Sequence, residues 1–128
     1  MVTEITQGVK VSVLTEFISE YSKPENSHYV FAYHIKIENY SEYAVQLLRR
    51  HWLIYDANGT KGEVEGEGVI GLQPILEQGA IHEYSSGCNL RTPLGKMKGT
   101  YLMERLSDGH QFKVTIPTFT LIAPYILN

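Results

Sequence analysis

The chain has 128 residues, enough for one domain with a single buried core, and we expect residues 1–128 to form that domain. Its content of 43% hydrophobic and 20% charged residues excludes a disordered polypeptide. Eleven basic against fourteen acidic side chains give a net charge of −3, which argues against binding nucleic acid or an anionic membrane through bulk charge.

The single cysteine and the first residues indicate the compartment. Cys88 alone cannot form an internal disulfide or a cysteine-built zinc site, which favours a reducing environment. The opening residues lack the basic head and apolar run of a signal peptide, and no apolar stretch approaches the ~20 residues that span a bilayer. We therefore expect a cytoplasmic protein without a membrane segment.

Apolar and polar residues alternate in three segments, 9–13, 29–37 and 112–116. In the second of them, one parity holds five large apolar residues, namely Tyr29, Phe31, Tyr33, Ile35 and Ile37. Because successive strand side chains point to opposite faces, this pattern predicts strands with one buried and one solvated face. Such strands are typical of antiparallel sheets.

Turn-forming residues separate these segments. Breaks are expected at 24–26 and 39–41, while Asn58-Gly59 and Asp108-Gly109 accept the positive φ that a two-residue hairpin turn requires. Several short strands separated by turn-forming residues favour a β-sandwich or a barrel.

Segment 44–55 is compatible with two structures. A helical stripe runs through Ala44, Leu47, Leu48, His51 and Tyr55. However, the segment continues directly into 56–59 and 61–65, which together look like a turn and the second arm of a hairpin, and no capping residue marks a helix end. We favour a strand and keep the helix as the alternative. A lone Trp52 in a middle strand is also familiar from immunoglobulin-like sandwiches, although no cysteine pair accompanies it.

Gly66, Gly68 and Gly71 form a literal G-x-G-x-x-G motif. In a dinucleotide fold, such glycines let the backbone approach a pyrophosphate that sits on a helix N-terminus. Here Pro74 leaves no room for that helix, and Glu67 would repel phosphate. We therefore favour a glycine-rich crossover between two sheets, and we retain Gly66, Glu67, Gly68 and Gly71 as a candidate ligand loop.

Glu63, Glu65 and Glu67 alternate, so they share one face of an extended chain. Three carboxylates in this arrangement are a candidate site for a hard cation such as Mg²⁺, with Asp56 across the hairpin as a further ligand. The alternative is a solvated strand face. The histidines show no spacing typical of a transition-metal centre.

Residues 82–88 bring His, Glu, Ser and Cys close together in sequence. Neighbours on a strand point to opposite faces, so these residues do not predict a converging nucleophile, base and orienting group. We interpret Cys88 as a small, partly buried side chain.

Two further segments are interpreted as structural. Lys96 and Lys98, with Arg91 nearby, form a modest basic patch beside Tyr101, which we assign to a solvated strand edge rather than to nucleic-acid binding. The apolar tail 119–127 would promote aggregation if it were free. We expect it to pack on the sandwich or on a second subunit, and the second arrangement would make a homodimer.

A series of fixed spacings extends over nearly the whole chain. Besides the glycine motif, it comprises Gln73-Pro74, Gly79, the Tyr-Ser-Ser-Gly-Cys run at 84–88, Leu90, Thr92-Pro93, Gly95, Met97, Gly99, Tyr101, Met103, Phe112, Ile116-Pro117 and Phe119. With these residues the sequence resembles the bacterial ApaG protein family. Leu72, Gln78 and Thr100 depart from the usual pattern, and all of them lie beside the glycines rather than replacing them.

The resemblance implies an all-β, immunoglobulin or fibronectin type III-like antiparallel β-sandwich. Family members are often named for cobalt resistance and magnesium efflux, and related eukaryotic domains have an inferred protein-binding role. The resemblance supplies no established catalytic triad, so none is carried over to this chain. We therefore expect a non-enzymatic module that acts through a protein partner on Co²⁺ and Mg²⁺ homeostasis, with these cations as the only candidate cofactors. The alternative is a nucleotide- or pyrophosphate-binding protein, with or without enzymatic activity, that uses the glycine motif.

Overall fold

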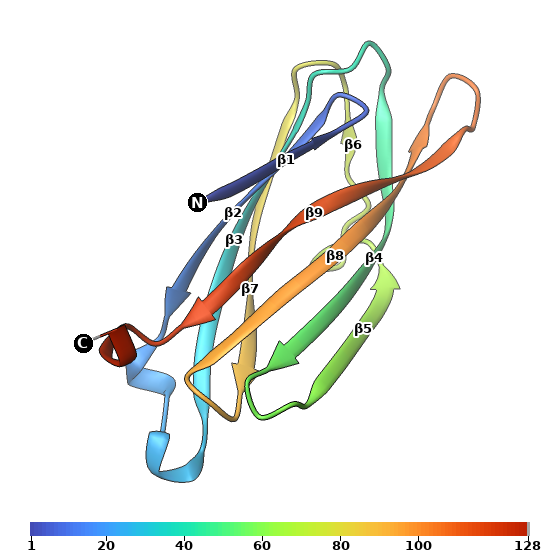
Figure 1. The fold of residues 1–128 in the computed structure, drawn as a ribbon. Coiled ribbons are helices and arrows are strands. Elements are labelled where there is room, and N and C mark those ends of the chain that lie inside the picture. The colour runs from blue at the N-terminus through green and yellow to red at the C-terminus, as the bar shows by residue number, and fades with distance from the viewer. Residues whose placement is uncertain (128) are drawn as a thin grey trace.

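The computed structural model describes residues 1–127, which form nine strands and three short 3₁₀ segments (Figure 1). The strands are β1 (Val2–Thr6), β2 (Val9–Phe17), β3 (Tyr29–Asn39), β4 (Val45–Asp56), β5 (Lys61–Glu67), β6 (Ile75–Leu76), β7 (Ile81–Leu90), β8 (Leu94–Arg105) and β9 (Gln111–Ile122). The 3₁₀ segments are Ser19–Tyr21, Pro24–Asn26 and Pro124–Leu127. In this described part of the chain, no helix is long and apolar enough to cross a membrane.

The strands form two antiparallel sheets packed face to face (Figure 1). The first sheet has the order β1-β2-β3-β7, and the second has the order β5-β4-β8-β9 with β6 also paired to β4. The chain passes from one sheet to the other after β3, after β6 and again after β7. Such connections are those of immunoglobulin-like sandwiches, so the predicted fold class is confirmed.

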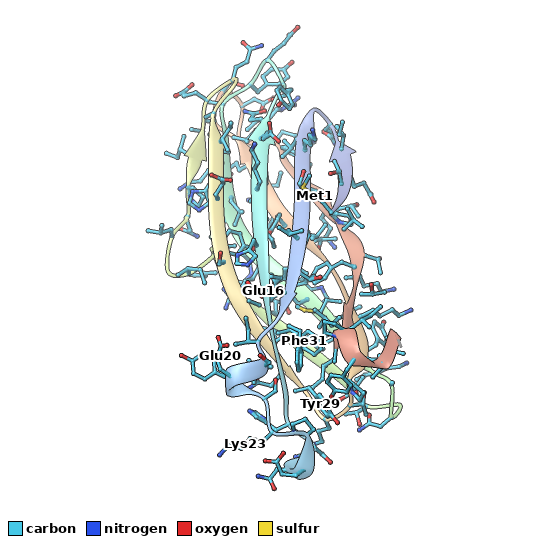
Figure 2. All side chains as sticks on the ribbon, turned by 90° about the vertical axis from the view of Figure 1, so that its left-hand side faces the viewer. Met1, Glu16, Glu20, Lys23, Tyr29 and Phe31 are labelled. Atoms are coloured by element: carbon cyan, nitrogen blue, oxygen red, sulfur yellow. The ribbon has the colours of Figure 1, made fainter. Side chains whose placement is uncertain are left out.

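The core lies between the sheets because each strand buries one parity of its side chains. In the first sheet, Val11 and Val13 of β2 pair with Ile37 and Ile35 of β3, and all four are buried. Figure 2 shows Phe31 inside the sandwich, whereas Glu20 and Lys23 point outward. Removing these apolar faces from water is the main force that holds the sheets together.

Trp52 confirms both the strand prediction for 44–55 and the resemblance to immunoglobulin-like sandwiches. It lies on β4, almost fully buried, with its ring centroid 5.3 Å from that of Tyr33 and 5.8 Å from that of Phe119. The helical alternative for this segment is therefore wrong. A β-bulge between Leu47 and Arg49 interrupts the pairing of β4 with β8. This bulge moves the buried positions from Val45 and Leu47 before it to Trp52 after it, so a simple apolar alternation does not run through the segment.

The hairpins form at the predicted dipeptides, but their turns are longer than two residues. Gly59 and Gly109 have φ of +90° and +72°, and each donates its amide to the residue that precedes its turn, Asp56 or Arg105. The residues just before these glycines do not take positive φ. A two-residue turn with two positive φ values instead closes the unpredicted β1–β2 hairpin at Gln7-Gly8.

The sandwich has two contrasting long edges. At the closed edge, β9 packs against β1 and β2, and the Thr115 amide donates to Thr6 Oγ1 at 3.2 Å. Pro117 is tolerated within β9 because this strand is the last of its sheet. The apolar tail packs here, since Leu121 and Ala123 are fully buried. Asn128 lies outside the described residues.

The open edge lies on the opposite side of the sandwich. We define it as β7, the last strand of the first sheet, together with β5, β6 and the intervening segment 68–74, which run along β4 in the second sheet. All glycines of the G-x-G-x-x-G motif lie at this edge.

Candidate functional site

The glycine motif joins β5 to β6. Both strands pair with β4, so the predicted crossover between two sheets is wrong, and the segment stays at the edge of the second sheet. The Val69 amide donates to the Leu72 carbonyl oxygen at 2.8 Å, and the Leu72 amide donates back at 3.0 Å. Between them, Ile70 and Gly71 have φ of +47° and +74°, as in a tight hairpin turn. The motif leads into this turn and β6 rather than into a helix.

Ile70 occupies an unfavourable backbone conformation at the tip of this turn. A β-branched residue at positive φ is an outlier, and left-handed backbone costs a residue other than glycine about 1–2 kcal/mol. The side chain is 61% exposed, so burial does not offset this cost. Leu72 in the same turn and Ile75 at the start of β6 are each 55% exposed. The turn therefore presents two large apolar side chains to solvent, and β6 adds a third.

Gly68 fixes the turn against the rest of the edge. Its amide donates to the Leu48 carbonyl oxygen at 2.8 Å, and its φ is +60°. A Cβ atom at this position would lie 2.1 Å from the Leu72 carbonyl oxygen, so only glycine fits. Because the amides of Gly68, Val69 and Leu72 all bond within the protein, the loop does not offer them to a phosphate.

Arg50 holds the glycine segment through hydrogen bonds from its side chain. After the bulge in β4, Arg50 lies on the same side as Trp52, opposite Gly66 of β5. A Cβ atom on Gly66 would lie 3.1–3.3 Å from the guanidinium group, so this glycine leaves the space through which the arginine passes. Arg50 Nη1 donates to the carbonyl oxygens of Glu67 at 2.9 Å and Gly68 at 3.1 Å.

A cavity of about 150 Å³ lies between Arg50 and the first sheet. Its lining comes from both sheets and from the turn, and comprises Tyr33, Arg50, Trp52, Val69, Ile70, Gly71, Tyr84 and Ser86. Tyr33 and Ser86 are cross-strand neighbours on β3 and β7. The Tyr84 hydroxyl hydrogen-bonds to the hydroxyl of the fully buried Tyr101. Besides Trp52, the polar side chains of the lining are thus an arginine and three hydroxyls, without a carboxylate.

Burial sets the protonation state of the tyrosines around this cavity. Loss of hydration raises the pKa of Tyr33, Tyr84 and Tyr101, because their anionic forms would lose solvation by water. A tyrosine with the ordinary pKa of 10.0 already keeps its proton at neutral pH, and burial extends the protonated state of these three hydroxyls to more alkaline pH. The cavity offers hydrogen-bond donors and a positive charge, but no general base.

The predicted acidic row lies on the exposed outer face of β5. Glu63 Oε2 approaches His51 Nε2 to 3.1 Å, without the alignment of a hydrogen bond. Asp56 is engaged elsewhere, since its carboxylate accepts bonds from the Arg91 amide and the Thr92 hydroxyl. Within residues 1–127, no three carboxylate, histidine or cysteine side chains converge closely enough to hold a metal ion. Glu63, Glu65 and Glu67 thus share a face, and cation binding by them stays a prediction.

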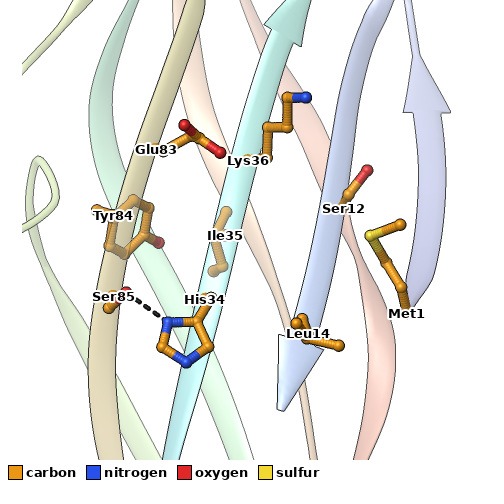
Figure 3. A pocket seen from close by; sticks show the side chains of 9 residues that line it. All are labelled: Met1, Ser12, Leu14, His34, Ile35, Lys36, Glu83, Tyr84 and Ser85. Carbon is orange, nitrogen blue, oxygen red and sulfur yellow. Dashed lines mark hydrogen bonds between the residues drawn. The ribbon is translucent and has the colours of Figure 1, made fainter.

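A larger hollow of about 380 Å³ lies on the outer face of the first sheet (Figure 3). There, Ser85 Oγ lies 2.6 Å from His34 Nδ1, and Glu16 Oε2 lies 3.3 Å from His34 Nε2. The order resembles a serine–histidine–acid triad. However, the His34 and Glu16 side chains are 41% and 61% exposed on an open sheet face. Catalysis by such a triad needs preorganised oxyanion donors and exclusion of water, so we interpret the array as a cross-strand hydrogen-bond network.

Cys88 is not an activated nucleophile. It is buried, and burial raises the pKa of its thiol to about 11, so the thiolate is scarce at neutral pH. The sequence predicts a small, partly buried side chain for Cys88, and the structure shows that it is buried.

The basic patch surrounds a different tyrosine from the one predicted. Tyr101 is fully buried, whereas Lys61, Lys96 and Lys98 place their ammonium groups 5.2–5.7 Å from the ring centroid of Tyr55. These lysines stand on the solvated outer face of the second sheet, and each cation–π contact at such a site is weak.

Sequence reasoning missed the polar residues that converge on the cavity. The alternation in 29–37 predicts only that Tyr33 lies on a buried face, and no position within segment 44–55 is predicted for Arg50. The available signal was the Arg49-Arg50 pair within an apolar strand, because one of two successive strand residues has to face inward. The hydroxyl groups that join Arg50 in the cavity belong to Tyr33 on β3 and to Tyr84 and Ser86 on β7, which are distant from Arg50 in the sequence.

Comparison with known proteins gives a consistent result. The family model described as the ApaG domain matches residues 19–105. Protein ApaG of Sinorhizobium fredii is 48% identical over 128 residues, which cover 100% of this chain and 98% of the relative. Protein ApaG of Anaeromyxobacter dehalogenans is 46% identical over the full length of both chains. The crystal structure of a candidate ApaA protein from Bordetella pertussis superposes with a TM-score of 0.88 at 42% identity, covering 91% of this chain and 94% of that one.

Proposed function

The chain belongs to the ApaG family, and on that premise we propose that it is a non-enzymatic module that binds a protein partner at the open edge. The observation that carries this proposal is the turn at 69–72, which is rigidly held and exposes Ile70 and Leu72. Partner interfaces are commonly built from apolar anchors with a few well-placed polar groups beside them.

The conformation of Ile70 supports a role in binding. A glycine or asparagine would adopt positive φ at lower cost, and an exposed isoleucine adds nothing to the core. Strained residues of this kind are concentrated at functional positions. Since the turn is already fixed by its hydrogen bonds, a partner would meet an ordered surface and lose little conformational entropy on binding.

The chemistry of the cavity supports binding over catalysis. Its tyrosine hydroxyls keep their protons, and its lining includes no carboxylate, histidine or cysteine. General base and nucleophilic catalysis need a group that can take up a proton or carry an activated lone pair, and the lining offers neither. The cavity can position a ligand, which is what a binding module requires.

We place this module in the cytoplasm and connect it with Co²⁺ and Mg²⁺ homeostasis through its partner. The single cysteine suits a reducing compartment, and the family resemblance carries the cation role. Neither nucleic acid nor a membrane belongs to this proposal, because the net charge is −3. A homodimer through the C-terminal tail is a separate expectation, which light scattering on the purified protein tests directly.

Capture from a native cytoplasmic extract tests the partner proposal. The bait is the purified chain, compared with an Ile70→Ser/Leu72→Ser variant and with Leu14→Ser, which removes an exposed leucine from the outer face of the first sheet. We expect at least one protein to be retained by wild type and Leu14→Ser and lost from the double variant. That protein, once purified, should bind the chain directly in a titration. Equal capture by all three baits would reject the open edge as the binding surface.

Calorimetric titration tests the nucleotide alternative and direct cation binding. The ligands are ATP, a diadenosine polyphosphate, Mg²⁺ and Co²⁺. We expect no micromolar affinity for either nucleotide, because the amides of Gly68, Val69 and Leu72 bond internally. Micromolar nucleotide binding that is lost in Gly68→Val would overturn the proposal. For the cations, a thermal stabilisation that Glu65→Gln/Glu67→Gln abolishes would establish a direct site on β5.

A further inference from the structure

We propose that the cavity between Arg50 and the tyrosines at the open edge receives a single carboxylate group from the polypeptide partner. This inference rests on the proposed function, because it names the chemical group by which a partner is recognised there. The group is either an aspartate or glutamate side chain or a C-terminal carboxylate. The juxtaposition that carries the inference is one arginine that shares the lining of a cavity with the hydroxyls of Tyr33, Tyr84 and Ser86.

Arg50 has hydrogen-bonding capacity that the protein itself leaves unused. A guanidinium carries five N–H donors, and the recorded bonds of Arg50 both come from Nη1. Among the described residues, no carboxylate oxygen lies within 4.0 Å of its nitrogen atoms. A partly buried guanidinium without an acidic partner gains charge-assisted hydrogen bonds when a carboxylate arrives.

The single positive charge of the cavity favours a ligand group with one negative charge over a group with two. Arg50 is the one ionisable cation among the lining residues, and a guanidinium matches a carboxylate in both charge and planar geometry. A phosphate group near pH 7 carries a charge of about −1.5 to −2 and would be left partly uncompensated. Glu67, which is exposed on the glycine segment, would add to that repulsion.

The size of the cavity excludes a whole metabolite. Pockets for small molecules usually occupy about 300–1,000 Å³, whereas this cavity measures about 150 Å³. It can hold a carboxylate and the carbon atoms that carry it, but not a nucleotide. The rest of the ligand has to lie outside, where Ile70 and Leu72 offer apolar contact. A polypeptide with an acidic residue beside an apolar one has this composition.

The binding geometry is prepared before the ligand arrives. Arg50 passes over Gly66 and is held by two backbone carbonyl groups, so its long side chain does not need to be ordered on binding. The Tyr84 hydroxyl is held by Tyr101, and Ser86 lies on the paired strand β7. Preorganised donors of this kind lower the entropic cost of association.

Two-dimensional ¹H–¹⁵N NMR on the full chain tests the inference with defined probes. The tripeptide Ac-Leu-Asp-Leu-NH₂ provides a side-chain carboxylate, and Ac-Leu-Leu-OH provides a terminal one. Ac-Leu-Asn-Leu-NH₂ and inorganic phosphate serve as the uncharged and the dianionic comparison. We expect at least one of the two carboxylate probes to give saturable shifts at Ile70, Gly71, Tyr84 and Ser86, with the asparagine peptide at least tenfold weaker.

The sequence provides a matched pair of variants. Arg50→Gln and Arg49→Gln remove the same charge from adjacent residues, but Arg49 lies on the exposed outer face of β4. We expect Arg50→Gln to weaken the carboxylate probes by at least tenfold and Arg49→Gln to change them less than twofold. Ser86→Ala, which removes one donor and keeps the arginine, should give an intermediate loss and serves as the second test if Arg50→Gln does not fold.

Three results would overturn the inference: no saturable shift with either carboxylate, equal weakening by both arginine variants, or tighter binding of phosphate than of the peptides. Its failure is distinguishable from failure of the proposed function. If the carboxylate probes fail while Ile70→Ser/Leu72→Ser still loses a captured partner, the open edge remains a binding surface without a carboxylate pocket. If the double variant loses no partner, the proposed function itself fails.

Discussion

The closed and open edges of the sandwich are formed by the same two sheets but differ in their side chains. At the closed edge, β9 packs against β1 and β2, and fully buried apolar residues such as Val11 and Leu121 fill the interior. At the open edge, Arg50 and hydroxyl groups line a cavity, and a strained turn covers it. The difference indicates that the closed edge contributes more to the free energy of folding. At the open edge, the strained turn and the exposed apolar side chains lower that contribution, while hydrogen-bond donors and apolar groups stay accessible from solvent.

The largest expected effect tests how firmly the open edge is fixed. Gly68→Ala should lower the free energy of unfolding by about 4 kcal/mol, since it adds backbone strain and a clash with the Leu72 carbonyl group. Gly71→Ala is the control, because it has positive φ but nothing within 4 Å of its Cβ position, and it should cost about 1 kcal/mol. Urea unfolding measures both, and equal losses would contradict the close approach at Gly68.

A core substitution at the closed edge should affect stability alone. Leu121→Ala should cost about 3 kcal/mol, because it leaves a cavity in fully buried surroundings. Below its unfolding temperature, the variant should capture the same partner as wild type. If Leu121→Ala lost the partner as completely as Ile70→Ser/Leu72→Ser, the functional separation of the two edges would be wrong.

Alkaline pH should weaken the open-edge interior through its tyrosines. Tyr84 and Tyr101 have raised pKa values in the folded protein, and their ordinary value in the unfolded chain is 10.0. Below pH 10 both states are protonated and stability is unchanged. Above it only the unfolded state ionises, so stability falls by about 1.4 kcal/mol per pH unit for each such group.

Urea unfolding between pH 8 and 11 measures this slope. Tyr84→Phe should reduce the slope by about one group, whereas Tyr21→Phe, at an exposed position, should leave it unchanged. A stability that stayed constant up to pH 11 would show that the two hydroxyls ionise freely within the fold.

The smallest effect has the opposite sign. Ile70→Asn should raise the free energy of unfolding by about 1 kcal/mol, because asparagine tolerates positive φ and little apolar burial is lost. The same variant should weaken partner capture. Thermal unfolding together with a binding titration measures the two changes. A variant that is less stable than wild type would show that the isoleucine serves packing rather than recognition.

The sequence predicts the strands well where one sheet face is buried. The alternation in 29–37 identifies β3, and Trp52 identifies a middle strand of a sandwich, because both patterns follow directly from burial. It fails at β1, whose residues are almost all exposed and therefore carry no apolar alternation. The length of the turns was also missed at Asn58-Gly59, where only Gly59 takes positive φ.

The candidate site could be predicted only in part. The glycine motif marks the correct segment, since Gly68 is required for sterically close packing. The cavity behind it depends on the bulge at Leu47/Arg49, which decides that Arg50 rather than Arg49 faces inward. No local pattern encodes that shift, nor the approach of Tyr33 and Tyr84 from the other sheet. Arg50, Tyr33 and Tyr84, which have the clearest chemistry for ligand binding, could therefore not be predicted from the sequence.

The acidic row on β5 has a consequence for solubility that does not depend on any metal. β5 is an outermost strand, so its free side exposes backbone groups that could pair with a second copy of the chain. Glu63, Glu65 and Glu67 all lie on this strand, and in an antiparallel pairing of two copies their charges would repel one another. The row is thus expected to disfavour pairing of β5 with the β5 strand of a second copy.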